Sequence, residues 1–233
     1  MQSLQRQDPD PDRTSASRFH APRACESGDR GSRRGARMTV PVIAPIVEGH
    51  GEREAVQALL ARLLPWLDDQ RYVHVHPPNR KPRDLLLKSH GLAAALREAM
   101  TLRPLPSGVL IMIDADDECP MTLAEHLRDL AKVVHPDAPS FVVIPNREFE
   151  AWFLAAASSF AGKFGLPEDL RPPPDPEAIR DAKGWFTKRM PRGRPYKPAV
   201  HQKQFAKLLD LDAARGSSRS FRKLCSDLER ILT

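Results

Sequence analysis

Short apolar runs alternate with segments of helical periodicity along most of the chain, and this alternation limits the possible folds more than any other feature. We predict strands at residues 40–49, 72–77, 108–118 and 140–145. Strands that are apolar along their whole length are buried on both faces, and strands separated by helices usually run parallel. The sequence therefore predicts an α/β fold, with a parallel sheet of about four strands flanked by helices.

The segments between these strands carry apolar residues three and four positions apart, as amphipathic helices do. In the first of them, Val56, Leu59, Leu60 and Leu63 share one helical face. After a proline-rich connection at residues 172–177, the pattern is helical and basic without further clear strands. We therefore expect three parts: a tail at residues 1–37, an α/β core at 38–165 and a basic helical C-terminal extension at 166–233.

The N-terminal tail holds eight arginines and five acidic residues, with no periodicity of either kind. Such a segment buries too little apolar surface to offset its ordering entropy, so we expect it to be disordered. Met38 directly precedes the first apolar run, which makes it a candidate for the natural start. The alternative is an arginine-rich tail that binds nucleic acid, but the interspersed acids disfavour it.

The cysteines and the hydropathy of the sequence bear on the cellular compartment of the protein. Cys25, Cys119 and Cys225 are too widely spaced for a CxxC-type zinc or redox motif. We interpret them as reduced thiols and expect a cytoplasmic protein. No apolar run approaches the ~18 residues that a membrane span requires.

The net charge of +6 is unevenly distributed. Residues 183–223 contain twelve lysines and arginines against two acids, which is +10, so the rest of the chain sums to −4. A basic surface attracts phosphate backbones without reading their sequence. The candidate nucleic-acid contacts are Lys188, Arg189, Arg192, Arg194, Lys197 and Lys203. The alternative is a helical surface that is simply solvated. The aromatic residues interleaved with these charges could stack on bases or pack in a hydrophobic core.

Acidic residues follow three of the four predicted strands. Ligands of open parallel sheets bind beyond the carboxyl ends of the strands, so these acids should converge on one edge. They are Glu48 after the first strand, Asp114, Asp116 and Asp117 after the third, and Glu148 and Glu150 after the fourth. Clustered carboxylates repel one another, and a divalent cation such as Mg²⁺ or Mn²⁺ would neutralise them. Alternatively, some of these acids only complement helix dipoles.

Spacing refines this prediction. In an extended segment Asp114 and Asp116 point the same way, as a DxD metal clamp requires. Glu48 is a candidate metal ligand or general acid/base, and the glycines beside it permit a tight turn. The string VEGHGERE is neither a Walker A loop nor a GxGxxG motif.

Two motifs in this order resemble the signature motifs of the Toprim domain, which topoisomerases, primases and overcoming-lysogenization-defect (OLD) nucleases share. They are VEGHGE at residues 47–52 and IDADD at 113–117. The stretch REFEAWF at 147–153, with YKP at 196–198 and SRSF at 218–221, resembles domain-of-unknown-function family 4276. Members of that bacterial family are often encoded beside AAA-type ATPases, some of them in phage-defence settings.

The resemblance implies roles for individual residues. Glu48 would match the Toprim glutamate, as general acid/base or metal ligand, and Asp114 with Asp116 would match the metal-binding pair. In OLD-type nucleases further acids complete a second metal site, for which Asp117, Glu148 and Glu150 are candidates here. No tyrosine matches a topoisomerase nucleophile, which favours hydrolysis without a covalent intermediate.

We therefore predict a Mg²⁺- or Mn²⁺-dependent nuclease that acts on DNA or RNA and has an ATPase partner in phage defence. The first alternative is a non-catalytic Toprim-fold subunit that binds and regulates an AAA-type ATPase. The second is a metal-dependent phosphoryl or nucleotidyl transferase acting on a small substrate.

Overall fold

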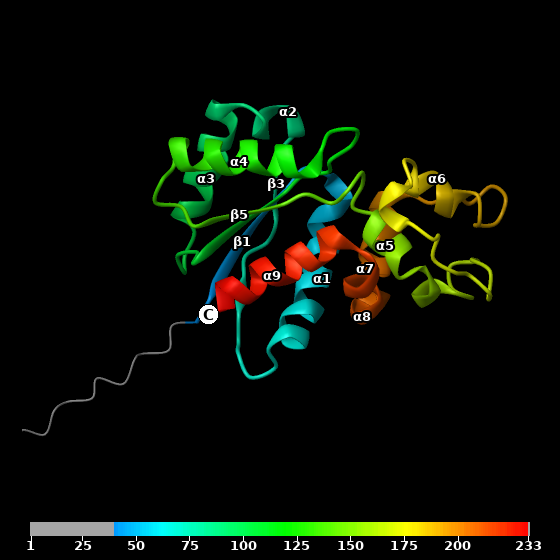
Figure 1. The fold of residues 1–233 in the computed structure, drawn as a ribbon. Helices are drawn as coiled ribbons and strands as arrows, with labels where there is room; N and C mark the ends of the chain where they lie inside the picture. Colours follow the sequence, from blue (N-terminus) through cyan, green and yellow to red (C-terminus); the bar gives the residue numbers. More distant parts are fainter. Residues whose placement is uncertain (1–39, 233) are drawn as a thin grey trace, which may run out of the picture. The chain divides into compact units, whose positions relative to one another are not determined.

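The computed structural model describes residues 40–232, so the predictions for the tail and for Cys25 lie outside the described residues. The predicted parallel sheet is confirmed, with β1 at its centre beside β4 (Figure 1). The strand order is β2-β1-β4-β5, and the short β3 also pairs with β1. The strands are β1 (Val42–Val47), β2 (His74–Val75), β3 (Asn79–Arg80), β4 (Gly108–Met112) and β5 (Ser140–Val143).

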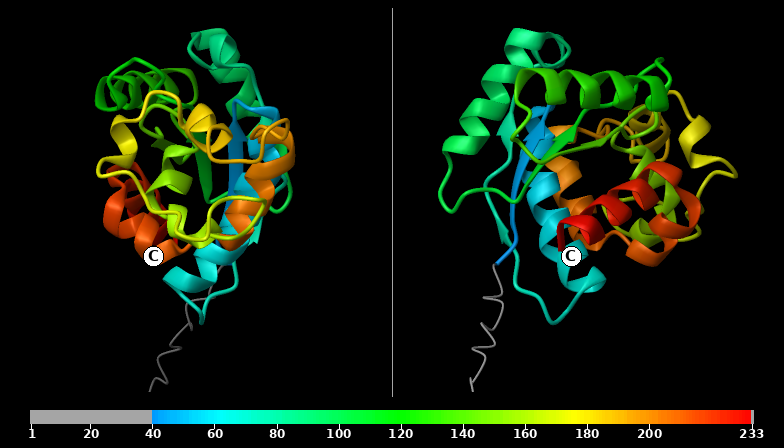
Figure 2. Two further views of the ribbon diagram at one scale, coloured as in Figure 1. Left: turned by 90° about the vertical axis from the view of Figure 1, so that its right-hand side faces the viewer. Right: turned by 60° about the vertical axis from the view of Figure 1, so that its left-hand side comes forward.

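Helices cover both faces of this sheet, as predicted (Figures 1 and 2). One face is covered by α2 (Arg83–Leu86), α3 (Ser89–Thr101) and α4 (Pro120–Val134). The opposite face is covered by α1 (His50–Leu67), α5 (Ala151–Ala155), α7 (Pro198–Leu208), α8 (Leu211–Ser217) and α9 (Arg219–Leu232). Two short 3₁₀ turns, η1 (Ala157–Phe160) and η2 (Pro176–Ala178), and the helix α6 (Ala182–Thr187) complete the elements.

The position of β1 at the centre of the sheet explains why polar and apolar residues do not alternate along this strand. Ile43 and Val47 pack into the core beneath α1, while Ala44 and Ile46 pack into the core beneath α3 and α4. All six residues of β1 are buried. A strand with apolar neighbours on both faces must be apolar at every position, which is the pattern that the sequence shows.

Four of the five aromatic residues in the basic stretch 183–223 are core residues. Phe186, Tyr196, Phe205 and Phe221 are all buried, and Phe160 and Phe205 stack with ring centroids 4.1 Å apart. The same core also contains residues of β1 and α1. These aromatic side chains therefore anchor the C-terminal helices to the sheet and are not free to stack on bases. The boundary at residue 165 stays a prediction.

Two local features fall between the predicted strands and the helices. The basic stretch after residue 77 contains β3 and the helical turn α2. The helix after β5 begins only at Ala151, because Arg147 has a left-handed backbone with φ of 68°. Glu148 and Glu150 therefore lie in the turn before the helix. Within residues 40–232 no helix is both long and apolar enough to cross a bilayer.

Candidate functional site

Three carboxylates meet where β1 and β4 end. Glu48 follows β1, Asp114 lies two residues beyond β4, and Glu52 is in the first turn of α1. One oxygen from each side chain lies within 4.8 Å of one oxygen of each of the others. We call Glu48, Glu52 and Asp114 the acidic trio. The structure thus brings two sequence-predicted residues together and adds Glu52, the last residue of the VEGHGE motif.

The register of the sheet explains this meeting. β1 and β4 are parallel neighbours whose last partners are Val47 and Met112, so the residues that follow emerge at the same edge. Glu52 also accepts a hydrogen bond from the backbone nitrogen of Gly49 at 3.2 Å, which fixes its side chain toward the end of β1. A Cβ atom at Gly49 would collide with the Glu52 carboxylate, so a larger residue there would displace the Glu52 side chain.

Burial and mutual repulsion shift the acidic trio toward its protonated form. Burial, followed by repulsion from Glu52, Glu150 and Glu48, raises the pKa of Asp114 well above its usual value. Burial raises the pKa of Glu52 to about 7. It also raises the pKa of Glu48, although the Arg83 guanidinium opposes this shift. The positive charges of Arg83 and Lys183 therefore do not offset burial and repulsion, and a bound cation would favour the ionised forms.

The donor set suits a hard divalent cation. All three side chains offer carboxylate oxygens, which Mg²⁺ and Mn²⁺ prefer. Within the described residues, the buried Oε2 of Glu48 has no hydrogen-bond partner, nor does the Oε2 of Glu150. Each of these oxygens instead faces a cationic side chain, with Arg83 Nη1 3.6 Å from Glu48 Oε2 and Lys183 Nζ 3.3 Å from Glu150 Oε2. The acidic trio therefore fits a hard divalent cation.

Glu148 and Glu150 lie against a lysine that the sequence did not single out. The Lys183 Nζ is 3.1 Å from Glu148 Oε1 and 3.3 Å from Glu150 Oε2. Glu148 also accepts hydrogen bonds from the backbone nitrogens of Ala182, at 3.0 Å, and Lys183, at 3.3 Å. The side chain of Gln202, from α7, donates to Glu150 Oε1 at 2.9 Å. This arrangement ties α6 and α7 to the edge of the sheet beside the acidic trio.

The second aspartate of the DxD does not lie beside the first. The strand ends at Met112, and Asp116 has a left-handed backbone with φ of 49°, so strand alternation does not reach it. Asp114 is buried, whereas the Asp116 side chain is 60% exposed. Asp116 lies 3.7 Å from the Nε of Arg83, a residue of α2. The extended geometry assumed for this pair is therefore not found.

Asp117 pairs with two arginines and is not a member of the acidic trio. Its Oδ1 is 2.7 Å from Arg147 Nη1 and 3.1 Å from Arg180 Nη2. Arg83 similarly connects the two acidic loops, because its Nη1 lies 3.6 Å from Glu48 Oε2 and its Nη2 pairs with Glu118. Glu52 was recognisable from its spacing, four residues after Glu48. Nothing in the sequence pattern marked Arg83 or Lys183 as members of this site.

Five of the six candidate phosphate contacts lie on the surface. The exposed residues are Lys188, Arg189, Arg192, Arg194 and Lys197. Arg189 stacks over Trp185 with its Cζ 3.6 Å from the ring centroid. Lys203 is half-buried, and its Nζ lies 2.9 Å from Glu54. Residues 188–197 form the connection between α6 and α7, the two helices that Lys183 and Gln202 tie to Glu150.

Comparison with known proteins identifies a family but no better-described relative. A family model with the description "Domain of unknown function (DUF4276)" matches residues 47–229, which is most of the chain. No curated protein matches the chain, and neither does any solved structure. The matched region includes the whole acidic trio, Lys183 and the connection between α6 and α7.

Proposed function

The chain belongs to the DUF4276 family, and we propose that it is a Mg²⁺- or Mn²⁺-dependent phosphodiesterase of the Toprim type that cleaves DNA or RNA. The observation that carries this proposal is the meeting of three carboxylates, within 4.8 Å, at the carboxyl ends of two adjacent parallel strands. This is where ligands of open α/β sheets bind. Of the reactions that such a site can perform, metal-assisted hydrolysis is the one that a cluster of carboxylates supports.

Asp114 and Glu52 would hold the cation, because both are buried and, among residues 40–232, neither carboxylate has an arginine or lysine in hydrogen-bond contact. When bound, such a cation stabilises the negative charge on the phosphoryl oxygens and on the leaving oxygen. Glu48 is the member of the trio that solvent reaches, with its side chain 17% exposed. We therefore assign to Glu48 the transfer of a proton to or from the attacking water.

The substrate backbone would be held by positive charge beside this centre. The Lys183 side chain is 36% exposed, so its Nζ contacts Glu148 and Glu150 while part of the side chain reaches solvent. A cation placed there can stabilise the charge that develops on the phosphoryl group in the transition state. The exposed lysines and arginines of residues 188–197 extend the positive charge from α6 toward α7. These contacts would position a phosphate backbone without reading its sequence.

We propose an AAA-type ATPase partner and a role in phage defence, both of which follow from the family resemblance. We also propose a cytoplasmic location, which follows from the cysteines. The described cysteines are consistent with a reducing compartment, since Cys119 and Cys225 are both free thiols.

Cleavage assays with the full chain test the activity. We expect Mn²⁺-dependent cleavage of at least one of three fluorescently labelled substrates: single-stranded DNA, double-stranded DNA or single-stranded RNA. Glu48→Gln and Asp114→Asn should each lower the rate at least a hundredfold, because each removes a carboxylate from the acidic trio. The matched control is Glu54→Gln on the exposed face of α1, which should retain the wild-type rate.

Circular dichroism would first establish that each variant is folded. Unchanged cleavage in Glu48→Gln and Asp114→Asn would contradict the proposed site. A wild-type protein that binds Mn²⁺ but cleaves none of the three substrates, and that copurifies with an ATPase, would favour the non-catalytic subunit instead.

A further inference from the structure

One aromatic residue of the basic stretch 183–223 is not buried in the core. Trp185 in α6 is half-buried, and the guanidinium of Arg189 lies over its ring, with Cζ 3.6 Å from the ring centroid. The Nη1 of Arg189 also donates a hydrogen bond to the backbone oxygen of Trp185 at 3.0 Å, which holds the guanidinium in place. An arginine fixed over an aromatic ring offers a flat, positively charged surface on which an unpaired base can stack. We call this pair the Trp185–Arg189 stack.

The turn that follows the stack is anchored at both ends. The backbone nitrogen of Arg194 donates to the Pro191 oxygen at 3.0 Å, and Gly193 between them has a left-handed backbone with φ of 81°. A Cβ atom at Gly193 would meet no other atom within 4 Å, so the turn projects into solvent beyond α6 (Figure 1). The buried side chains of Met190 and Tyr196 fix the chain on either side. A surface that is fixed before binding loses less conformational entropy when it binds a ligand. We call this β-turn, from Pro191 to Arg194, the basic turn.

A second exposed aromatic ring lies beside the basic turn. Phe164 is 37% exposed, although its ring packs on that of Phe205 with the centroids 5.0 Å apart. The next residue, Gly165, lies against Pro191, because a Cβ atom built there would be 2.5 Å from the Pro191 Cγ. Phe164 has a left-handed backbone with φ of 56°, which costs free energy for a bulky residue and is found most often at functional sites. Its position is consistent with a contact to a ligand at the basic turn.

The positive charge around the basic turn is not offset by acids. Residues 183–197 contain six lysines and arginines and no acidic residue. Five of the six are exposed and pair with no carboxylate among residues 40–232, namely Lys188, Arg189, Arg192, Arg194 and Lys197. The exposed acids Glu168 and Asp169, in the loop that follows Phe164, form no ion pair with them. These cations are therefore free to bind phosphates.

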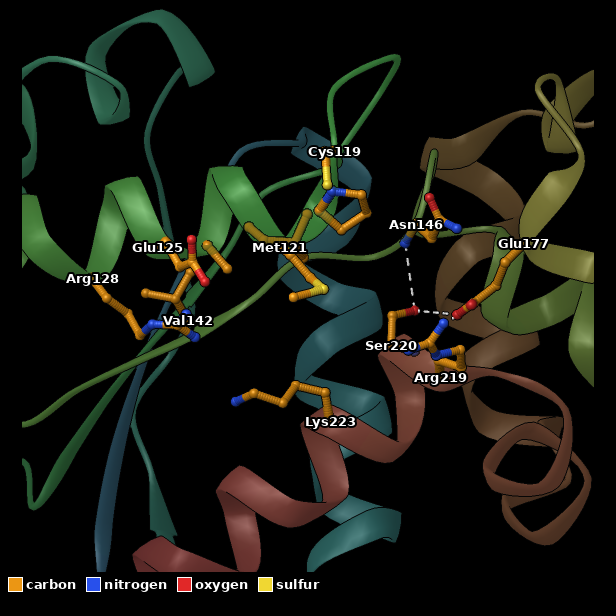
Figure 3. Close-up of a pocket in the computed structure, with 13 residues that line it drawn as sticks. Cys119, Met121, Glu125, Arg128, Val142, Asn146, Glu177, Arg219, Ser220 and Lys223 are labelled. Atoms are coloured by element: carbon orange, nitrogen blue, oxygen red, sulfur yellow. Dashed lines mark hydrogen bonds between the residues drawn. The ribbon is translucent and has the colours of Figure 1, made fainter.

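A pocket of about 550 Å³ between α4 and α9 also contains basic side chains, but its charge is balanced (Figure 3). Its lining includes three basic and two acidic residues, which are Arg128, Arg219, Lys223, Glu125 and Glu177. Lys223 is already paired with Asp227. None of the residues that line this pocket is aromatic. The pocket therefore lacks both features of the surface around the basic turn, and its arginines provide a control for charge.

We propose that the surface around the basic turn binds single-stranded nucleic acid. The Trp185–Arg189 stack and Phe164 each hold an unpaired base, and the exposed cations of residues 188–197 hold the phosphates. This inference names the substrate class of the proposed nuclease and therefore rests on the proposed function. In a duplex the bases are paired and stacked on one another, so their faces are not available to these side chains. Aromatic platforms on a basic surface are the recognition mode of proteins that bind single strands without reading their sequence.

Binding to the wild-type full chain tests this proposal without any variant. Fluorescence anisotropy is measured in excess chelator, so that cleavage does not interfere. The probes are fluorescein-labelled oligonucleotides of about twelve nucleotides: a thymidine strand, a uridine strand, a DNA duplex and a DNA strand in which most nucleotides are abasic. We expect the thymidine and uridine strands to bind at least tenfold more tightly than the duplex. They should also bind at least tenfold more tightly than the abasic strand, which keeps the phosphates but has few bases to stack.

Substitution of Trp185 tests the stack. Trp185→Leu should weaken binding of the thymidine strand about tenfold and leave binding of the duplex within twofold, because it removes the ring but no charge. The matched control is Trp66→Leu, which removes another half-buried tryptophan that faces an arginine, with the Arg215 Cζ 5.4 Å from the ring centroid. This control should bind the thymidine strand as the wild type does.

Charge reversal tests the basic turn. Arg192→Glu combined with Arg194→Glu should weaken binding of the thymidine strand and of the duplex at least tenfold, because both ligands carry phosphates. The same change of charge in the pocket between α4 and α9, Arg128→Glu combined with Arg219→Glu, should leave both affinities within threefold of the wild type.

Four results would overturn the proposal. They are equal binding of the thymidine strand and the duplex, equal binding of the intact and abasic strands, equal losses in Trp185→Leu and Trp66→Leu, and equal losses in the two charge-reversal variants. The first two use the wild-type protein, so they do not depend on the folding of any variant. Cleavage is a separate measurement. Binding that depends on bases, without cleavage in Mn²⁺, would support this inference and contradict the proposed activity, whereas cleavage of duplex DNA without a preference for single strands would do the reverse.

Discussion

The Nζ of Lys183 lies 3.3 Å from Oε2 of Glu150, a carboxylate with no exposed side-chain surface. Burial raises the pKa of Glu150, and Lys183 is the strongest influence that opposes this shift. The opposite shift occurs in the partner: burial lowers the pKa of Lys183, but Glu150 and Glu148 more than reverse this and raise it above the ordinary lysine value. Lys183 is therefore held in its charged form, and it limits the rise in the pKa of Glu150 at the edge of the candidate site.

We predict that Lys183→Met destabilises the protein by about 2–3 kcal/mol at pH 8, because it leaves Glu150 buried without a counter-ion. This value is below that for a fully buried pair, since solvent reaches part of Lys183. The control Lys203→Met removes an exposed pair with Glu54 and should cost less than about 1 kcal/mol. Urea denaturation of both variants measures the difference, and equal losses would contradict the importance of the Lys183–Glu150 contact.

The metal-free protein should become less stable as the pH rises through neutrality. The pKa of Glu52 is about 7 in the folded protein, against 4.5 as its ordinary value. The folded state therefore holds this proton more tightly, so the stabilisation is complete below about pH 4.5 and is lost as the pH rises through about 7. A difference of about 2.5 pKa units corresponds to roughly 3 kcal/mol. Urea denaturation at pH 5 and pH 8.5, with excess chelator, measures the loss.

Glu52→Gln is the control for this pH dependence, because glutamine does not titrate. We expect its free energy of unfolding to change by clearly less than that of the wild type between the same two pH values. Excess Mn²⁺ should restore the stability of the wild type at pH 8.5, since a ligand that binds the folded state stabilises it. Identical pH profiles for the wild type and Glu52→Gln would show that Glu52 is not the titrating group.

The ligand set can be tested by calorimetric titration with Mn²⁺ at pH 7.5. We predict that Glu52→Gln weakens binding at least tenfold, because it removes one member of the acidic trio. Asp117→Asn should remain within twofold of the wild type, since Asp117 is bound to Arg147 and Arg180. A larger loss in Asp117→Asn than in Glu52→Gln would favour the ligand set inferred from the sequence over the acidic trio.

Hydrophobic patterning was sufficient to predict the sheet. The four predicted strands each contain an observed strand, because a buried parallel strand must be apolar on both faces. The parallel order also correctly placed Glu48 and Asp114 at one edge. The strand positions could be predicted because they depend on residues close together in sequence. The placement of Glu48 and Asp114 could be predicted because the carboxyl ends of parallel strands lie at the same edge.

The unpredicted parts of the site depend on contacts between distant segments. Lys183 reaches Glu150 because α6 packs back against the sheet edge, and no local pattern encodes that return. Arg83 pairs with Glu48 across the turn that follows β3, a two-residue strand too short to recognise. Asp116 departs from the predicted direction because the strand ends four residues before it.

The hydroxyl group of Ser220 connects α9 to α5, and its removal gives a final prediction. The Ser220 Oγ accepts a hydrogen bond from the Trp152 Nε1 at 2.8 Å and donates to Glu177 Oε1 at 2.6 Å. Ser220→Ala would leave the buried indole N–H without its acceptor, which should cost about 1–3 kcal/mol. Ser217→Ala, at an exposed position in α8, should cost less than about 0.5 kcal/mol.

The same variant should change the response to acid. Burial raises the pKa of Glu177, but hydrogen bonds from Ser218 and Ser220 outweigh it and hold the pKa below the ordinary value. A lowered pKa in the folded state stabilises the protein above the unfolded value, and this stability is lost as the pH falls through the folded value. Ser220→Ala removes part of that stabilisation, so its deficit relative to the wild type should be larger at pH 7 than at pH 3. Urea denaturation at both pH values checks this, and a deficit independent of pH would mean that Ser220 acts on Trp152 alone.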